Sequence, residues 1–299
     1  MRVVSLLPAG TEIVAALGAA DFLVGISHEC DHPPSVTHLP RITTTAIDPS
    51  APAAGIDAEV RRLRQSGQPV IAVHGAQLLA LQPDLIVTQA LCDVCAVAEG
   101  QILGLAQTLP GARVLSLRAE SVNGIWCDVR AVGEALGLLD EAEELIGQLE
   151  NRLDRIKRNR PAAPPRVACV EWLDPLYLAG HWVPELVECA GGIDVLGRAG
   201  ERSVQRQWAE LKELRPELVL VMLCGYGVDR ARRELERLDH PDAWEVMSDA
   251  PVYILDAHAY TSRPGPRVVE GALRIQDAIM NRVPPDLQRS SPTMRYSRL

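Results

Sequence analysis

The sequence predicts an α/β protein of two lobes that are bridged by one long helix. Residues 140–159 form one continuous helical pattern, with apolar side chains at spacings of three and four. Segments that read alternately as strands and helices lie on each side of it. The two sides also repeat one motif, a helix followed by a proline, an acid and an apolar strand, at residues 78–87 and 211–220. The alternative is one larger domain with an ordinary surface helix.

Short apolar runs bounded by turn residues predict the strands, because β-branched residues fill these runs and glycine, proline or aspartate ends them. We expect strands at residues 2–7, 22–27, 70–73, 85–88, 113–117, 166–171, 218–221 and 252–256. Periodic apolar residues predict the helices, and Gly18, Gly137 and Gly191 mark helix ends. We expect helices at residues 11–17, 57–66, 122–136, 185–190, 208–214 and 268–282, helices that end at 81 and 109, and loops at 90–95 and 172–184.

The long helix carries its own start and stop signals. Asp140 is expected to cap its amino terminus, with Glu143 at the reciprocal capping-box position. A proline-rich run at residues 161–165 ends it. A helix of this length spans about 30 Å, which suits a stiff strut between lobes. We expect a first lobe at residues 1–125, a helical linker at 126–160, a second lobe at 161–282 and a loosely held tail at 283–299.

Composition and charge exclude several classes of protein. The chain has 299 residues, 47% of them hydrophobic and 23% charged, as in an ordinary globular protein with room for two cores. A net charge of -9 without a long basic run argues against binding to nucleic acid or to an anionic membrane surface. No apolar run reaches about 18 residues, so we expect no membrane span.

The opening of the chain and its cysteines bear on location. Pro8 and Gly10 interrupt the first apolar run before the core of an export signal could form. The chain has seven cysteines, an odd number, which favours reduced thiols over a disulfide framework. We therefore expect a cytoplasmic protein, or a periplasmic or surface protein if a leader has been lost.

Candidate ligand-binding residues follow the predicted strands. Ligands of parallel α/β sheets collect outside the carboxyl ends of the strands. Only 4% of the chain is aromatic, yet these segments hold five aromatic residues: Trp172, Tyr177, Trp182, Tyr226 and Tyr260. Such side chains are often platforms for flat ligands, and the alternative for each is that it plugs the base of a loop.

Four of these segments, residues 5–12, 25–33, 171–186 and 256–267, closely resemble the cobalamin/iron-chelate branch of the helical-backbone substrate-binding proteins of ABC importers. The cobalamin-binding members are the most similar, and the resemblance extends from about residue 2 to residue 280. It implies a periplasmic-binding-protein fold of two Rossmann-like lobes, with the ligand cleft between the lobes and no enzymatic activity. Cobalamin or a related metal chelate would be the ligand rather than a required cofactor.

The resemblance also implies roles for single residues. From the first lobe, the residues that would line the cleft are Pro8, Ala9, Gly10, Thr11 and Glu12. From the second lobe, they would be Trp172, Trp182, Tyr260 and Arg263. Arg263 could hydrogen-bond an amide or a carboxylate of the ligand, and the alternative is a surface salt bridge. His181 could ligate cobalt or haem iron, as could His258, or each could be a hydrogen-bonded structural histidine.

The resemblance implies an ABC permease as partner, and the cobalamin-binding members would dock with it through one surface glutamate on each lobe. The sequence departs from that pattern, because Ala76 and Ala209 stand at the two positions, seven residues before Pro83 and Pro216.

A thiol cluster is a further candidate site. Cys92 and Cys95 form one CxxC, and Cys30 follows another strand. With His28 or His74 the three thiols could hold zinc, and the alternatives are a redox pair or packed cysteines.

The sequence shows no nucleophile–base–acid set, glycine-rich phosphate loop or HExxH motif. This absence favours a binding protein over an enzyme, and the resemblance implies that its ligand is a corrinoid, with cobalamin first. The alternatives are an iron-siderophore or haem binder on the same fold, and a cytosolic corrinoid-handling enzyme or carrier.

Overall fold

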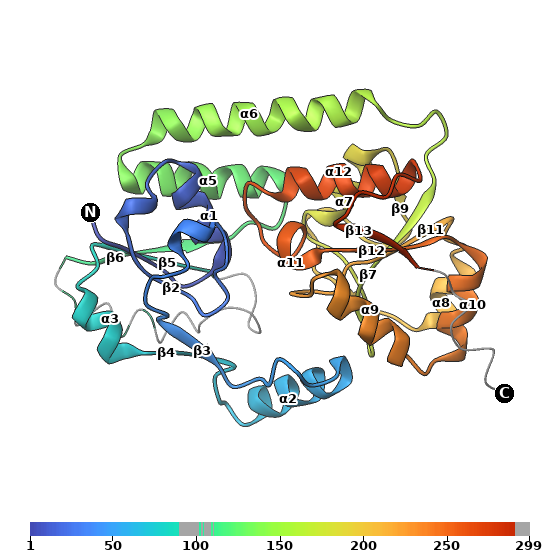
Figure 1. The fold of residues 1–299 in the computed structure, drawn as a ribbon, viewed down its shortest axis with the longest axis horizontal. Helices are drawn as coiled ribbons and strands as arrows, with labels where there is room; N and C mark the ends of the chain where they lie inside the picture. The colour runs from blue at the N-terminus through green and yellow to red at the C-terminus, as the bar shows by residue number, and fades with distance from the viewer. Residues whose placement is uncertain (90–101, 103, 105–108, 110, 291–299) are drawn as a thin grey trace. The chain divides into compact units, whose positions relative to one another are not determined.

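The structure is a computed structural model, which describes residues 1–89, 102, 104, 109 and 111–290. It divides into two compact units (Figure 1). Unit 1 consists of residues 1–51, 55–119 and 123–148, and unit 2 of residues 52–54, 120–122 and 149–299. The predicted α/β class, with two lobes and one long helix that belongs to both, is confirmed. The loop predicted at residues 90–95 lies outside the described residues, as does most of the helix expected after it.

Unit 1 is built on a four-stranded parallel sheet with the order β2-β1-β5-β6. A separate antiparallel pair is formed by β3 and β4. The strands are β1 (Val3–Ser5), β2 (Leu23–Ile26), β3 (Thr43–Thr45), β4 (Ile71–Val73), β5 (Leu85–Gln89) and β6 (Arg113–Leu117). The helices are α1 (Pro8–Ala16), η1 (Ala20–Phe22), η2 (Pro34–Val36), α2 (Ala53–Gln65), α3 (Gly75–Leu81) and α5 (Val122–Leu136).

Unit 2 is built on a larger mixed sheet with the order β10-β8-β7-β11-β12-β13, and β9 pairs with β7. The strands are β7 (Arg166–Leu173), β8 (Leu176–Leu178), β9 (Ile193–Asp194), β10 (Val204–Gln205), β11 (Leu218–Val221), β12 (Val252–Leu255) and β13 (Leu287–Ser290). The helices are α7 (Val183–Ala190), α8 (Trp208–Glu213), α9 (Val228–Arg237), α10 (Pro241–Asp249), α11 (Ala257–Tyr260) and α12 (Val268–Ile279). The central strands β11 and β12 are buried along their whole length, as expected for parallel strands covered on both faces.

The long helix α6 (Leu139–Arg158) begins and ends one residue before the predicted range. Its apolar stripe is buried, with Ile146, Leu149 and Leu153 each 4% exposed. The predicted capping box is wrong, because Glu143 forms an ion pair with Arg130 of α5. A bidentate arginine attracts the carboxylate more strongly than a backbone N–H does.

Each half of α6 is attached to its own unit. In unit 1 the helix approaches α5 closely, since a Cβ added to Gly133 would lie 2.5 Å from Ala142 Cβ. In unit 2 the side-chain amide of Gln276 donates to the carbonyl of Ile156 at 2.7 Å, near the carboxyl end of α6. The same carbonyl accepts the backbone N–H of Asn159 at 3.0 Å, so the side chain of Gln276 adds a second donor at the end of the helix.

The internal repeat predicted from the sequence is confirmed at the level of hydrogen bonds. In unit 1, Asp84 Oδ2 accepts the backbone N–H of Arg2 at 2.7 Å, at the start of the first strand. In unit 2, Glu217 Oε2 accepts the backbone N–H of Arg166 at 2.9 Å. The residue before the proline of each motif is left-handed, with φ of 44° at Gln82 and 48° at Arg215. The Pro-acid turn therefore anchors the first strand of each sheet in the same way.

Three predicted boundaries are wrong for physical reasons. Helix α1 begins at Pro8 rather than after it, because proline suits the first turn of a helix, where its missing N–H is not needed. The long loop predicted at residues 172–184 contains β8, which turns back on β7 as a hairpin. Part of the predicted loose tail, residues 287–290, forms β13, and Leu287 is only 2% exposed.

Candidate functional site

Aromatic side chains gather at one edge of the unit 2 sheet. The strands β7, β11 and β12 are adjacent and parallel, so their carboxyl ends meet at the same edge. Trp172 lies at the end of β7, Tyr226 follows β11, and Tyr260 ends α11, directly after β12. This edge is where a doubly wound sheet binds ligands. The structure therefore brings together three of the five predicted aromatic residues.

Trp172 and Tyr226 contact each other directly. Their ring centroids lie 5.4 Å apart with an interplanar angle of 63°, an edge-to-face arrangement. Across the hairpin, Trp172 pairs with Tyr177, whose hydroxyl donates to Gln205 Oε1 at 3.3 Å. The indole N–H of Trp172 has no hydrogen-bond partner. This nitrogen is buried, so it is an unsatisfied donor of the cluster rather than an exposed one.

Arg230 is a member of this cluster that the sequence did not reveal. Its guanidinium carbon lies 3.7 Å from the centre of the Tyr226 ring, and its Nη2 donates to the Tyr226 hydroxyl at 2.8 Å. Burial raises the pKa of Tyr226 to about 12, so the phenol stays protonated near neutral pH. Arg230 follows Tyr226 by four residues, across the start of α9. That spacing could have indicated from the sequence that the two side chains are in contact.

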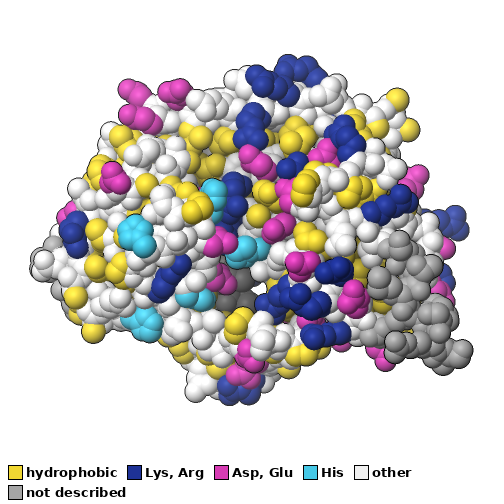
Figure 2. Space-filling model, viewed as in Figure 1, with side chains coloured by type: hydrophobic (Ala, Val, Ile, Leu, Met, Phe, Trp, Pro, Cys, Tyr) yellow, Lys and Arg dark blue, Asp and Glu magenta, His cyan; other side chains and the backbone are white. Residues whose placement is uncertain are grey.

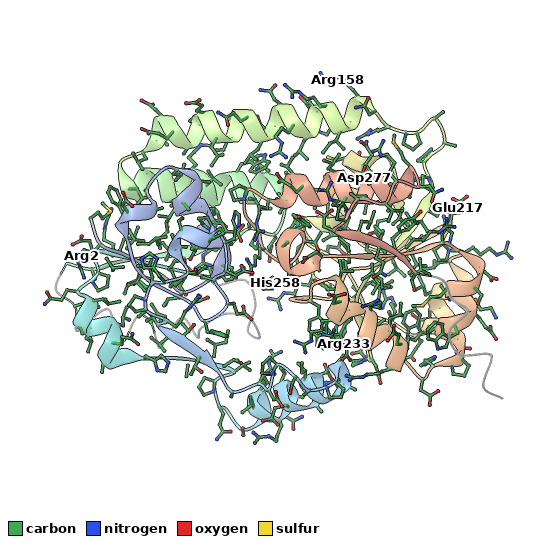
Figure 3. The ribbon with its side chains drawn as sticks, in the orientation of Figure 1. Arg2, Arg158, Glu217, Arg233, His258 and Asp277 are labelled. Carbon is green, nitrogen blue, oxygen red and sulfur yellow. The ribbon has the colours of Figure 1, made fainter. Side chains whose placement is uncertain are left out.

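Backbone and side-chain bonds join the segments that follow β11 and β12. The backbone N–H of His258 donates to the Tyr226 carbonyl at 3.1 Å, and that of Gly225 donates to Ser262 Oγ at 3.0 Å. Asp256 caps α11 by accepting the N–H of Ala259 at 2.9 Å. Figure 3 labels His258 beside α11. These bonds hold the two segments as one structure.

Arg263 is a buried cation rather than part of a surface salt bridge. It is 5% exposed, and its Nη2 lies 2.7 Å from His258 Nε2. A guanidinium carries only donors, so His258 Nε2 accepts this bond and is not available to a metal. The ring of His258 is therefore oriented by Arg263 from within unit 2.

Trp182, predicted to face the ligand or to plug the base of a loop, is buried in unit 2. It is 5% exposed, and its indole N–H donates to the Thr261 carbonyl at 3.0 Å. Its partner is 79 residues away in the sequence, so no local pattern announces the contact. Trp182 packs α7 against the segment after α11, which is a structural role.

His181 is held in a left-handed conformation, with φ of 54°. Its backbone N–H donates to the Glu201 carbonyl at 2.6 Å, and its carbonyl accepts the N–H of Gly200 at 2.9 Å. The buried Nδ1 of its ring has no hydrogen-bond partner. Burial lowers the pKa of His181; Glu120 opposes this shift and Arg202 adds to it, so the imidazole is neutral near pH 7.

In unit 1 the predicted ligand-lining residues form the first turns of α1. Only Pro8 is partly exposed, whereas Ala9, Gly10, Thr11 and Glu12 are buried. A Cβ on Gly10 would lie 2.8 Å from both Ser5 Oγ and Val87 Cγ1, so glycine lets α1 approach the sheet. These positions have a packing role in unit 1, which leaves Pro8 as the accessible member.

Cys30 is part of a buried hydrogen-bonded group rather than an open thiol site. Its sulfur lies 3.0 Å from Thr11 Oγ1 and 3.2 Å from Ser27 Oγ. Cys92 and Cys95 lie outside the described residues. Figure 2 shows histidine side chains over the part of unit 1 that carries β3 and β4. Within the described residues, no group of three His, Cys, Asp or Glu side chains could hold a metal ion.

His28 lies in the loop that follows β2 and contains Cys30, and it joins this loop to β3. Its Nδ1 lies 2.7 Å from Thr43 Oγ1, which also accepts its backbone N–H at 2.9 Å. Burial lowers the pKa of His28; Glu29 opposes this shift and Arg41 adds to it. Arg41 Nη1 donates to the carbonyls of Ser27, at 2.9 Å, and of Cys30. The loop after β2 is therefore built around its own bonds.

The two alanines at the predicted docking positions are exposed, Ala76 on α3 and Ala209 on α8. On the face of unit 2 drawn in Figure 2, Lys and Arg side chains lie among Asp and Glu side chains. Among the described residues, no helix is both long and apolar enough to cross a membrane.

A family model described as periplasmic binding protein matches residues 3–247 of the chain. A curated relative is an uncharacterized ABC transporter substrate-binding lipoprotein, YvrC of Bacillus subtilis (strain 168). It is 21% identical over 290 residues, which make up 93% of this chain and 79% of the relative.

Solved structures share the fold. A periplasmic heme binding protein from Pseudomonas aeruginosa is similar with a TM-score of 0.71 and 20% identity, over 97% of this chain and 98% of that one. The periplasmic vitamin B12 binding protein BtuF of Vibrio cholerae has a TM-score of 0.61 and 19% identity, over 94% and 96%. The periplasmic heme-binding protein RhuT from Roseiflexus sp. RS-1 has a TM-score of 0.67 and 20% identity, over 94% and 98%.

Proposed function

The chain belongs to the periplasmic binding protein family, and on that premise we propose that it captures a metal chelate, with cobalamin first, for an ABC importer. The observation that carries the proposal is the aromatic edge of unit 2. Trp172 and Tyr260 are both partly exposed there, and the buried Tyr226 packs edge-on against Trp172, in a chain that is only 4% aromatic. Rigid aromatic side chains bury the large apolar face of a macrocycle at little entropic cost.

The polar groups of this edge suit a macrocycle that carries amides. The indole N–H of Trp172 is buried without a partner, so it could donate to an amide oxygen of a ligand that displaces the side chains covering it. Such groups fix the orientation of a ligand that stacking alone would leave free to rotate. The proposed site therefore combines apolar area with directional donors.

Four tyrosine hydroxyls of the described residues are already hydrogen-bonded within the protein, which favours a chelate that brings its own axial ligand. The hydroxyls of Tyr177, Tyr226, Tyr253 and Tyr260 all hydrogen-bond protein side chains. Iron in haem takes an axial ligand from its protein, and a tyrosine is one way to supply it. A cobalamin that keeps its own base needs none, which places it first.

Haem or an iron-siderophore is the second candidate, and His181 is the observation in its favour. Its imidazole is neutral near pH 7 because burial lowers its pKa, and a neutral imidazole is the form that ligates iron. Two of the similar structures are named as heme-binding proteins. A cytosolic corrinoid-handling enzyme or carrier is the third candidate, and it predicts turnover of the chelate.

We propose capture without turnover, with an ABC permease as partner and a location outside the cytoplasmic membrane. The support is the family and the curated lipoprotein relative. Because Ala76 and Ala209 carry no charge, docking to the permease would depend on neighbouring side chains such as Gln77 and Glu210.

The test is calorimetric titration of the purified chain with cyanocobalamin, with haemin and a ferric siderophore in parallel. We expect one-to-one binding of cyanocobalamin, tighter than that of either other chelate. Preferential binding of haemin or the siderophore would establish the second candidate. Release of a modified chelate would establish the third, and heat from none of the titrants would contradict the proposal.

A further inference from the structure

The last described strand of the chain lies beside the ligand-bearing end of β12. Strand β13 pairs with β12 in the antiparallel direction, and Leu287 is opposite Leu255. The beginning of β13 therefore lies next to the carboxyl end of β12. Asp286 is the residue directly before Leu287. The antiparallel register therefore places Asp286 beside the residues that follow β12 and lead into α11. The antiparallel register thus brings a residue from the end of the chain to the proposed site.

Asp286 binds Tyr260 directly. The Tyr260 hydroxyl donates to Asp286 Oδ2 at 2.7 Å. The other oxygen, Oδ1, lies 2.7 Å from Arg274 Nε on α12. The tyrosine therefore holds one oxygen through a hydrogen bond. The arginine holds the other through charge, because neither Arg274 Nε nor Asp286 Oδ1 has a hydrogen-bond partner.

The network that holds Asp286 continues along α12. Arg274 Nη1 lies 3.2 Å from Asp277 Oδ2, and Asp277 Oδ1 lies 2.7 Å from Arg282 Nε. The guanidinium of Arg274 also lies 6.0 Å from the centre of the Tyr260 ring. Tyr260 is therefore fixed at its hydroxyl by Asp286 and flanked at its ring by Arg274.

We propose that residues 284–290 form a strap, and that Asp286 within it is a positioning residue that fixes Tyr260 as a ring platform for the ligand. The inference rests on the proposed function, because it assigns Tyr260 to the ligand site. It deepens that function by defining how Tyr260 acts: the ring faces the ligand, and the hydroxyl faces the protein. Metal coordination by Tyr260 is then not part of binding.

The protonation of the pair agrees with this geometry. Burial and the bond to Asp286 raise the pKa of Tyr260 to about 12. Burial alone would raise the pKa of Asp286, but the bonds from Arg274 and Tyr260 hold it below its ordinary value. A folded-state pKa that is depressed means that the strap is fully held above the ordinary carboxyl pKa and loosens as the pH falls through the folded value.

The experiment is a double-mutant cycle on the full chain with Tyr260→Phe, Asp286→Ala and the double variant, titrated with the chelate that binds the wild type. We expect Asp286→Ala to weaken binding by about tenfold, the order expected for one hydrogen bond to a charged group. In the Tyr260→Phe background, the same change should have no further effect, because its contribution passes through the hydroxyl.

Tyr253→Phe is the matched control. It also removes a tyrosine hydroxyl bonded in this region, to Asn281 Oδ1 at 2.5 Å, but Tyr253 is 1% exposed in the core. It should lower the melting temperature without changing affinity for the chelate. Losses that add in the double variant would overturn the positioning role, and so would unchanged affinity in Asp286→Ala.

A second measurement separates this inference from the proposed function. Amide hydrogen exchange in residues 257–267 needs no ligand, and it should speed up in Asp286→Ala but not in Tyr253→Phe. If the wild type binds no chelate, the proposed function fails, and faster exchange still supports the strap. Unchanged exchange in Asp286→Ala overturns the strap whatever the ligand.

Discussion

Trp172 and Trp182 differ in what their indole N–H groups bind. The N–H of Trp182 donates to the Thr261 carbonyl, and the side chain is 5% exposed. The N–H of Trp172 has no partner, and its ring packs edge-on against Tyr226. A satisfied donor inside the core stabilises the fold, whereas an unsatisfied buried donor costs free energy until an acceptor reaches it. The two residues therefore call for different experiments.

We expect Trp172→Ala to weaken chelate binding by about 1 kcal/mol or more, through lost contact area. Trp172→Ala should lower the free energy of unfolding by less than Trp182→Ala does. Trp182→Ala should instead cost about 3–5 kcal/mol of stability, as for a large core residue. Titration and chemical denaturation of both variants check this.

Trp244→Ala is the matched control for binding, because Trp244 lies on α10 and its N–H donates to the Leu238 carbonyl at 3.0 Å. Equal affinity in Trp172→Ala and Trp244→Ala would remove Trp172 from the site.

At the residue scale, the sequence predicts which side chains follow the strands, because the strand ends are local features. It does not predict the partner of each, because these partners are distant in the chain. Tyr260 and Asp286 are 26 residues apart, and Trp182 and Thr261 are 79 apart. Arg263 shows the same limit, since it is 5% exposed although it lies in a segment that the sequence predicts to be an accessible loop.

At the scale of elements, the contact between α5 and α6 in unit 1 depends on one glycine. A Cβ on Gly133 would lie 2.5 Å from Ala142 Cβ and 2.9 Å from the Leu138 carbonyl oxygen. A backbone oxygen cannot move aside as a side chain can. The first half of α6 therefore sits as close to α5 as it does only because this position lacks a side chain.

We expect Gly133→Ala to destabilise the protein by about 1–3 kcal/mol, as overpacking does. Gly147→Ala on α6 is the matched control, because a Cβ there meets nothing within 4 Å. It should stabilise the helix by about 0.5–1 kcal/mol through its better helix propensity. Thermal unfolding of both variants measures the difference, and a shift of the same sign in both would refute the packing argument.

Elements with strong local signals are predicted well. Strand β6, helix α5 and strand β11 match their predicted ranges at both ends. Elements stabilised mainly by pairing are missed, as β8 and β13 show. Strand β8 has only three residues and directly follows Pro175, and β13 is mostly polar and follows Pro284 and Pro285, so both read as loop or tail. Leu287 is the one large apolar residue of β13, which is too little pattern to predict a strand.

At the scale of the whole molecule, the internal repeat is the strongest prediction from the sequence. Two short motifs predicted two lobes of one fold, and the structure shows the same strand anchor in both, through Asp84 in unit 1 and Glu217 in unit 2. The placement of a ligand between the lobes stays a prediction. The identity of the ligand could not be predicted at this scale, because one fold serves vitamin B12 and heme in the similar structures.

The central claim is that unit 2 receives the chelate at the carboxyl ends of β7, β11 and β12. A crystal structure of the chain with cyanocobalamin tests it most directly. The claim predicts that the corrin lies against the partly exposed rings of Trp172 and Tyr260, with the Tyr260 hydroxyl still bonded to Asp286. A corrin bound away from these two residues, or cobalt coordinated by a tyrosine hydroxyl, would contradict it.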